Sequence, residues 1–148
     1  MLTDILIEIY ERDLDKLKTQ IESYANEDDL WKTDGQILNS AGNLCLHLNG
    51  NLQHFFGSVI GGTDYSRDRD LEFADKQVSR QKLVAGIDAA KEAVVSTLKK
   101  MTAEDYEKTY PLEVYGKPMT TGFFFVTLSS HFNWHLGQID YHRRLLAS

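Results

Sequence analysis

Hydrophobic residues recur every three or four positions in four long stretches of the chain, which is the spacing of an amphipathic α-helix. We expect helices over residues 3–24, 40–59, 79–101 and 121–146. Only two prolines occur in the 148 residues, so little interrupts these stretches. Four helices of about 20 residues that share one core predict an all-α four-helix bundle. The whole chain, residues 1–148, is expected to form a single domain.

Two connecting segments break the helical pattern. Residues 63–76 (TDYSRDRDLEFADK) are highly charged and lack a clear period, so we predict a long loop, a place where function is often found. Thr102 is a suitable N-cap for a short helical turn. Residues 110–119 contain two prolines and a glycine, and this composition suits a small hairpin that turns at Gly116 and Lys117.

Charge and cysteine content narrow the possible partners and compartment. The net charge of −6 argues against nucleic acid as a partner, because phosphate binding needs a basic surface. Cys45 is the only cysteine, which excludes an intramolecular disulfide and a cysteine-rich zinc site. The first residues do not resemble a signal peptide, and no apolar run reaches the length of a membrane span. We therefore expect a cytoplasmic protein that does not contact the membrane.

All five histidines lie in two of the predicted helices, and their spacing places them on shared faces. His47 and His54 are seven residues apart, as are His135 and His142, and His131 precedes His135 by four. These steps leave offsets of only about 20° and 40° around a helix. Imidazole is the commonest side-chain metal ligand and binds metals while neutral. Two facing helices with three such groups could hold a divalent metal in an open site.

The strongest pair is His131 and His135, which have the spacing of the two histidines in zinc proteases. Phe132 stands where those enzymes carry their general base, so that chemistry is not indicated. His47 lies at the centre of its helix's apolar face and is the best third ligand. The catalytic residues themselves stay unknown.

The two remaining histidines are expected at a pocket rim or on the surface. His54 lies two turns from His47, near the end of its helix. His142 lies about 10 Å along the helix from His135, which is too far to share a metal bound at about 2.1 Å.

A structural role is the alternative for each candidate, since a lone histidine on an apolar face is usually a hydrogen-bonded core residue. Asn43 and Asn51 flank His47 by four residues and are either second-shell groups or helix–helix hydrogen-bonding groups. Gln138 could orient a ligand or be structural. We expect Cys45 in the core, and Trp134 in packing or an interface. Residues 67–70 are expected to form a solvated ion-pair patch.

The chain resembles the DinB-like superfamily, which includes bacillithiol S-transferases and mycothiol-dependent maleylpyruvate isomerases. The likeness covers the whole chain. The similar segments are NSAGNLCLHLNGNLQHFFG and SSHFNWHLGQIDYHRRLL, and the loop GGTDYSRDRDLEF resembles a small, mostly uncharacterised branch. The resemblance implies a bundle of up-down-down-up order and a metal held by residues matching His47, His131 and His135. It also implies nickel, zinc, iron or manganese as the metal, and a homodimer.

Three functions remain open at this point. The first is a metal-dependent enzyme, a thiol S-transferase or a hydrolase, in which the metal activates a low-molecular-weight thiol for transfer to a small electrophile, as the resemblance implies. The chain has no obvious carboxylate base near the histidines, which favours thiol transfer over hydrolysis. The second is a non-catalytic metal- or ligand-binding bundle in a stress response, and a fourth protein ligand would support it. The third is a metal-free bundle that serves through its dimer face.

Overall fold

The computed structural model describes residues 2–148, and this part of the chain is helical without a named strand. Two α-helices, α3 and α5, are short, and a π-helix, η2, directly continues α2. The elements in order are α1 (Leu2–Glu22), η1 (Glu27–Trp31), α2 (Ala41–Leu52), η2 (Gln53–Ser58), α3 (Arg69–Ala74), α4 (Arg80–Lys99), α5 (Ala103–Glu107) and α6 (Thr121–Leu146).

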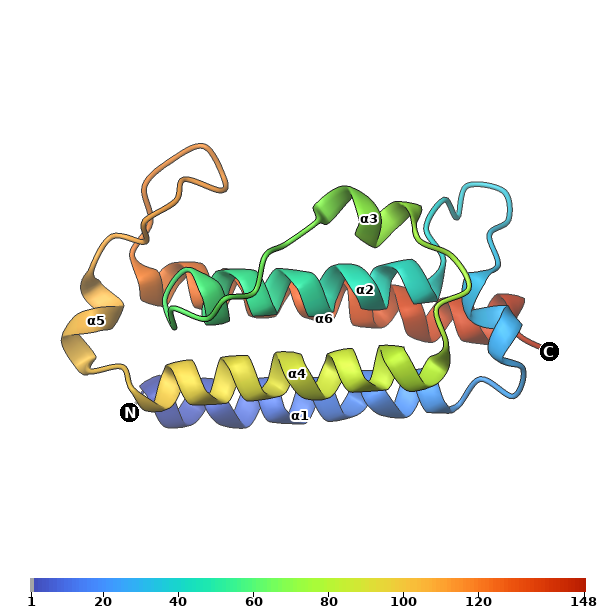
Figure 1. The fold of residues 1–148 in the computed structure, drawn as a ribbon, viewed down its shortest axis with the longest axis horizontal. Helices are drawn as coiled ribbons and strands as arrows, with labels where there is room; N and C mark the ends of the chain where they lie inside the picture. Colours follow the sequence, from blue (N-terminus) through green and yellow to red (C-terminus); the bar gives the residue numbers. More distant parts are fainter. Residues whose placement is uncertain (1) are drawn as a thin grey trace.

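The four long helices form a bundle, as the sequence predicts. Figure 1 shows α1 and α4 in one layer and α2 and α6 in the other, with the chain running up, down, down and up. Within the layers α1 packs on α4 and α2 packs on α6, and between the layers α2 packs on α4 and α1 packs on α6. The all-α fold class expected from the sequence is therefore confirmed, and the helix directions are consistent with the expected order.

Side-chain caps explain where three of the long helices begin. The hydroxyls of Ser40, Ser79 and Thr120 each accept a hydrogen bond from a backbone N–H in the first turn of α2, α4 and α6. Each such cap satisfies an N–H that the helix leaves free, which typically contributes about 1 kcal/mol. Thr102 caps α5 and forms a capping box with Asp105, as its position predicts.

The apolar faces of the four helices meet in one core. Leu14 and Leu17 of α1, Leu83 of α4 and Phe125 of α6 are completely buried. Phe56 stacks on Phe125 with ring centroids 3.9 Å apart, which joins η2 to α6 across the core. This core fixes α2 against α6, the two helices that carry the histidines.

The two connecting segments differ in how well the sequence predicts them. The predicted loop over residues 63–76 contains a helix, α3, which packs along α2 and lies over it in Figure 1. Residues 110–119 form a hairpin-like excursion with Gly116 in a left-handed conformation. Two backbone hydrogen bonds close its base, from Tyr110 to Met119 and from Thr121 to Lys108, although only a single bridge pairs the two sides.

Within residues 2–148, none of the helices combines the length and the hydrophobicity that crossing a membrane requires.

Candidate metal centre

Three histidines from two helices converge at one point of the α2–α6 interface. His47 projects from α2, while His131 and His135 project from successive turns of α6. The Nε2 atoms of His47 and His131 are 3.2 Å apart, and the ring centroids of His131 and His135 are 4.6 Å apart. One ligand nitrogen from each of the three lies within 4.8 Å of the others, so the group could hold a metal ion.

Hydrogen bonds fix which nitrogen of two of these rings carries the proton. His47 Nδ1 lies 3.1 Å from Glu72 Oε1, and His135 Nδ1 lies 2.7 Å from Gln138 Oε1. Both oxygens only accept, so each Nδ1 donates and each Nε2 keeps a free lone pair. Arg67 Nη2 also lies 3.3 Å from His47 Nδ1, but it donates to Glu72 Oε1 at the shorter distance of 2.9 Å. Metal-binding histidines usually have such a partner on the second nitrogen, since it orients the ring and raises its basicity.

The donor set suits a divalent metal better than it suits an empty cluster. Two imidazole nitrogens bound to one metal at about 2.1 Å lie roughly 3.0–3.4 Å apart, and the observed separation of 3.2 Å falls in that range. Without a metal, either two lone pairs face each other or His131 donates from Nε2. A metal would satisfy both facing lone pairs of the first arrangement. The Nδ1 of His131 is buried and has no hydrogen-bond partner within residues 2–148, whether or not Nε2 binds a metal.

The surroundings of His131 and His135 keep these two imidazoles neutral, the form that binds metal. Burial and the nearby charges of His135, His47, Arg67 and Arg69 lower the pKa of His131 to about 4. Burial also lowers the pKa of His135, and the hydrogen bond that His135 donates to Gln138 only partly opposes that shift. Both rings are therefore unprotonated near pH 7.

Glu72 and Arg67 form a buried ion pair directly behind His47. Arg67 Nε and Nη2 each donate to a different oxygen of Glu72 at 2.9 Å. Burial alone would raise the pKa of Glu72, but the hydrogen bonds from His47 and Arg67 outweigh it and hold the pKa below its usual value. Glu72 is thus a carboxylate whose charge is already shared between an arginine and an imidazole.

Two features of α2 hold the helix that carries Glu72. The Asn43 amide donates to the backbone oxygens of Glu72 and Asp75, at 2.9 and 2.8 Å, which ties the C-terminal half of α3 to α2. Gly50 faces the Glu72 carboxylate so closely that a Cβ there would overlap Oε2. Asp68 caps the start of α3 through a hydrogen bond from the Leu71 N–H.

The ion pair corrects two expectations from the sequence. Residues 67–70 are not simply a solvated patch, because Arg67 is nearly buried against Glu72. The expectation of no carboxylate near the histidines is also wrong, since Glu72 contacts His47. No signal in the sequence places Glu72 beside His47, because this contact depends on how α3 packs on α2.

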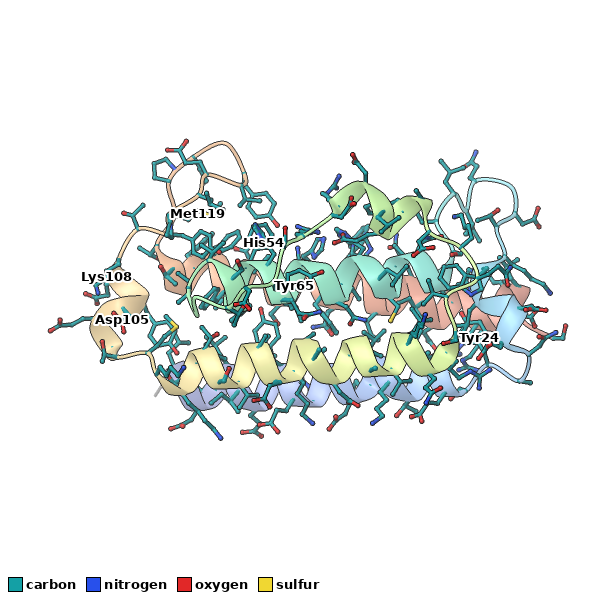
Figure 2. All side chains as sticks on the ribbon, viewed as in Figure 1. Tyr24, His54, Tyr65, Asp105, Lys108 and Met119 are labelled. Carbon is teal, nitrogen blue, oxygen red and sulfur yellow. The ribbon has the colours of Figure 1, made fainter. Side chains whose placement is uncertain are left out.

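His54 lies outside the three-histidine group. His54 is half-buried in η2. Because the π-helix has a wider turn and begins at Gln53, His54 no longer has the angular position relative to His47 that a continuous α-helix would give it. Figure 2 shows His54 on the side of the molecule where Tyr65 also lies. Burial and the charge of Arg67 lower the pKa of His54, which indicates that it faces the loop side of the site.

His142 is buried, only 3% exposed, so the expected surface position is wrong, but it lines the cavity that His135 also lines, in agreement with the expected pocket-rim position. Its Nε2 donates to the Lys32 carbonyl at 2.8 Å, and its Nδ1 accepts from the Tyr24 hydroxyl at 2.7 Å. These bonds satisfy both nitrogens and fasten the end of α6 to the segment after α1.

The other candidates have clear positions. Gln138 contacts His135, and Asn51 is buried on α2. Cys45 is fully buried, as expected, and burial raises the pKa of its thiol to about 12, so it is not a nucleophile. The sequence predicts either packing or an interface for Trp134. Because Trp134 is largely exposed, the interface is the role that remains.

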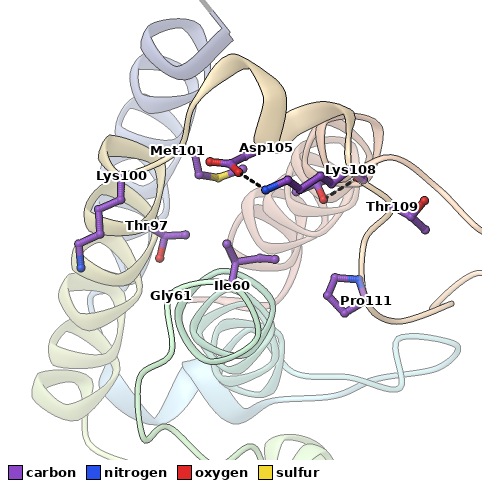
Figure 3. A pocket seen from close by; sticks show the side chains of 10 residues that line it. Ile60, Gly61, Thr97, Lys100, Met101, Asp105, Lys108, Thr109 and Pro111 are labelled. Atoms are coloured by element: carbon purple, nitrogen blue, oxygen red, sulfur yellow. Dashed lines mark hydrogen bonds and ion pairs between the residues drawn. The ribbon is translucent and has the colours of Figure 1, made fainter.

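A cavity of about 420 Å³ lies beside His135, one of the three histidines. Gln138, Leu38, Tyr141 and Leu145 also line it. Its walls are mostly apolar, and its size suits a small molecule. Another cavity, about 330 Å³ in volume, lies at the opposite end of the bundle near Ile60, Lys100 and Pro111, where Lys108 pairs with Asp105 (Figure 3). That second cavity contains none of the three histidines.

Comparison with known proteins agrees with the fold. A search of curated proteins gave no match. Among solved structures, a DinB-like protein from Bacillus cereus ATCC 10987 superposes with a TM-score of 0.74 at 16% sequence identity, covering 94% of this chain and 89% of that one. The model of the family described as "Protein of unknown function (DUF1572)" matches residues 5–148. The chain therefore belongs to the DUF1572 family, and the resemblance to DinB-like proteins predicted from its sequence is confirmed.

Proposed function

We propose that this protein is a metal-dependent enzyme that transfers a low-molecular-weight thiol to a small electrophile. The metal would be held by His47, His131 and His135. The observation that carries the proposal is the convergence of three imidazoles, with a 3.2 Å separation between two Nε2 atoms and the outer nitrogens of two rings fixed by Glu72 and Gln138.

The ligand set supports an open site rather than a closed structural one. Within residues 2–148, the group that could hold a metal consists of the three histidines alone, so His54 and the loop carboxylates are outside it. Three neutral ligands leave coordination positions for a substrate and leave the metal its full positive charge. When bound there, nickel, zinc, iron or manganese would lower the pKa of a thiol and supply the thiolate for transfer.

The protein's own groups fit the roles that such a reaction needs. Glu72 and Gln138 hold the imidazoles of His47 and His135 in position. Glu72 is engaged by Arg67, so it serves to orient His47 and is not free to abstract a proton from water. This arrangement favours thiol transfer over hydrolysis. The apolar cavity beside His135 provides a place for the electrophile.

The test is a screen of low-molecular-weight thiols, including bacillithiol, cysteine and glutathione, with a fluorogenic electrophile on metal-reconstituted protein. We expect metal-dependent transfer with at least one thiol, lost on His131→Ala and retained in His54→Ala, a matched histidine outside the cluster. Tight metal binding without transfer for any thiol would instead support the non-catalytic metal-binding bundle.

A further inference from the structure

An arginine on α3 lies near the three-histidine group without a partner of opposite charge. The Arg69 side chain is exposed and forms no hydrogen bond or ion pair within residues 2–148. Its guanidinium carbon instead lies 5.3 Å from the centre of the Phe73 ring, one turn further along the same helix. A guanidinium held over an aromatic ring keeps its N–H donors available to a ligand.

The Phe73 ring also fixes where Arg69 lies relative to the candidate metal centre. This ring packs on the His47 ring, with centroids 4.9 Å apart. Together the two distances limit the separation between the Arg69 guanidinium and the His47 ring to about 10 Å. Arg69 is therefore near enough to contact a small molecule that is bound at the three histidines.

A second guanidinium lies deeper on the same side of the centre. Arg67 donates through Nε and Nη2 to Glu72, and its Nη2 lies 3.3 Å from His47 Nδ1. The remaining nitrogen, Nη1, has no hydrogen-bond partner within residues 2–148. Because Arg67 already neutralises Glu72, the charge of Arg69 is left over.

The neighbouring carboxylates do not neutralise Arg69, although the chain has a net charge of −6. Asp68 accepts a hydrogen bond from the Leu71 N–H and so caps α3. Asp70 follows Arg69 directly, and adjacent residues of a helix do not face each other. A solvated surface arginine is the alternative to a binding role, and the position of Arg69 beside the centre is what favours the binding role.

The cavity beside His135 offers no complement to a charged substrate. None of the described residues that line it is Asp, Glu, Lys or Arg, and Leu38, Tyr141 and Leu145 make its wall largely apolar. This cavity suits an apolar electrophile. A charge on the other reactant, the thiol, is therefore complemented by the arginines of the α3 side.

From these observations we propose that Arg69 selects the thiol substrate by binding a carboxylate that this substrate carries. With the sulfur at the three-histidine centre, the carboxylate lies a few carbon atoms away and accepts hydrogen bonds from the Arg69 guanidinium. The planar fork of a guanidinium matches the two oxygens of a carboxylate. This inference rests on the function proposed above and adds to it the charge of the substrate and the residue that recognises it.

The test compares two thiols that differ in charge and not in length, 3-mercaptopropionate and its neutral amide, 3-mercaptopropionamide. Their dissociation constants are measured by calorimetry on the chain as purified and after loading with Zn²⁺. We expect the carboxylate to bind about tenfold more tightly, because a charge-assisted hydrogen bond is roughly twice as strong as a neutral one. Arg69→Gln should abolish this preference. Arg69→Lys keeps the charge without the planar fork and should retain part of it.

Lys100→Gln is the matched control. It also removes one exposed positive charge, but beside the cavity at the opposite end of the bundle (Figure 3), so the preference should survive. Circular dichroism checks that the variants stay folded. Equal affinities for the two thiols, no binding of either at millimolar concentration, a preference that Arg69→Gln leaves intact, or one that Lys100→Gln also abolishes would overturn the proposal.

The same measurements separate this inference from the proposed activity. A preference for the carboxylate that depends on Arg69, without transfer of any thiol, would support the inference and contradict the proposed enzyme. Metal-dependent transfer with equal affinity for the two thiols would support the enzyme and overturn the inference.

Discussion

At the scale of single residues, the centre depends on partners that decide how the histidines behave. Glu72 accepts from His47 Nδ1, and Gln138 accepts from His135 Nδ1, so both rings turn their Nε2 lone pairs toward His131. Arg67 in turn holds Glu72 with two hydrogen bonds of 2.9 Å. The geometry of the ligands therefore rests on residues that do not themselves belong to the group.

The first prediction concerns Glu72. Glu72→Gln keeps an oxygen that can face His47 but removes the charge that pairs with Arg67. Loss of such an outer partner typically weakens metal binding 10- to 100-fold, and we expect a decrease in that range by competition with a chelating dye. Asp70→Asn, an exposed change on the same short helix, should leave affinity unaltered. Equal affinities of wild type and Glu72→Gln would show that the carboxylate does not support His47.

The second prediction concerns the pH dependence of the metal-free protein. The pKa of His131 is about 4 in the folded state and about 6.5 in the unfolded chain, so the unfolded state binds more protons between these values. Folding stability is therefore lost as the pH falls from about 6.5 toward 4. His131→Gln lacks this titration. The urea midpoint of the variant minus that of the wild type should therefore become more favourable to the variant when the pH is lowered from 7 to 5. An unchanged difference would mean that His131 titrates normally.

At the scale of elements, periodicity was enough to predict the four long helices and to select His47, His131 and His135 from five histidines. It was not enough for α3, because a six-residue helix inside a charged loop has no apolar period to detect. The ion pair of Arg67 and Glu72 with His47 also escaped prediction, since it depends on how α3 docks on α2. The burial of His142 depends in the same way on contacts with Tyr24 and Lys32, which are distant in sequence.

The third prediction concerns the close approach of α3 to α2 at Gly50. A methyl group there would overlap the Glu72 carboxylate, so Gly50→Ala must move this carboxylate away from His47 and Arg67 or displace α3. We expect a loss of about 1–3 kcal/mol in the free energy of unfolding, together with weaker metal binding. Gly137→Ala is the control, because its Cβ meets open space and alanine favours the helix. Chemical denaturation should separate the two variants, and equal stability would contradict the observed docking of α3.

At the scale of the whole molecule, one helix carries most of the candidate centre. α6 supplies two of its three histidines, and an adjoining part of the same helix lines the cavity beside His135. The up-down-down-up order lets the second and last long helices lie side by side, which brings His47 to the two histidines of α6. The fold thus assembles the candidate centre from two segments that are more than 80 residues apart in the chain.

The central claim is that these three histidines bind one divalent metal, and its most direct test is the metal content of the purified chain after equilibrium dialysis. We expect about one nickel, zinc, iron or manganese ion per chain in wild type and in His54→Ala. His47→Ala, His131→Ala and His135→Ala should each lose most of it while remaining folded by circular dichroism. Metal content that is absent from wild type, or unchanged in all three variants, would contradict the account.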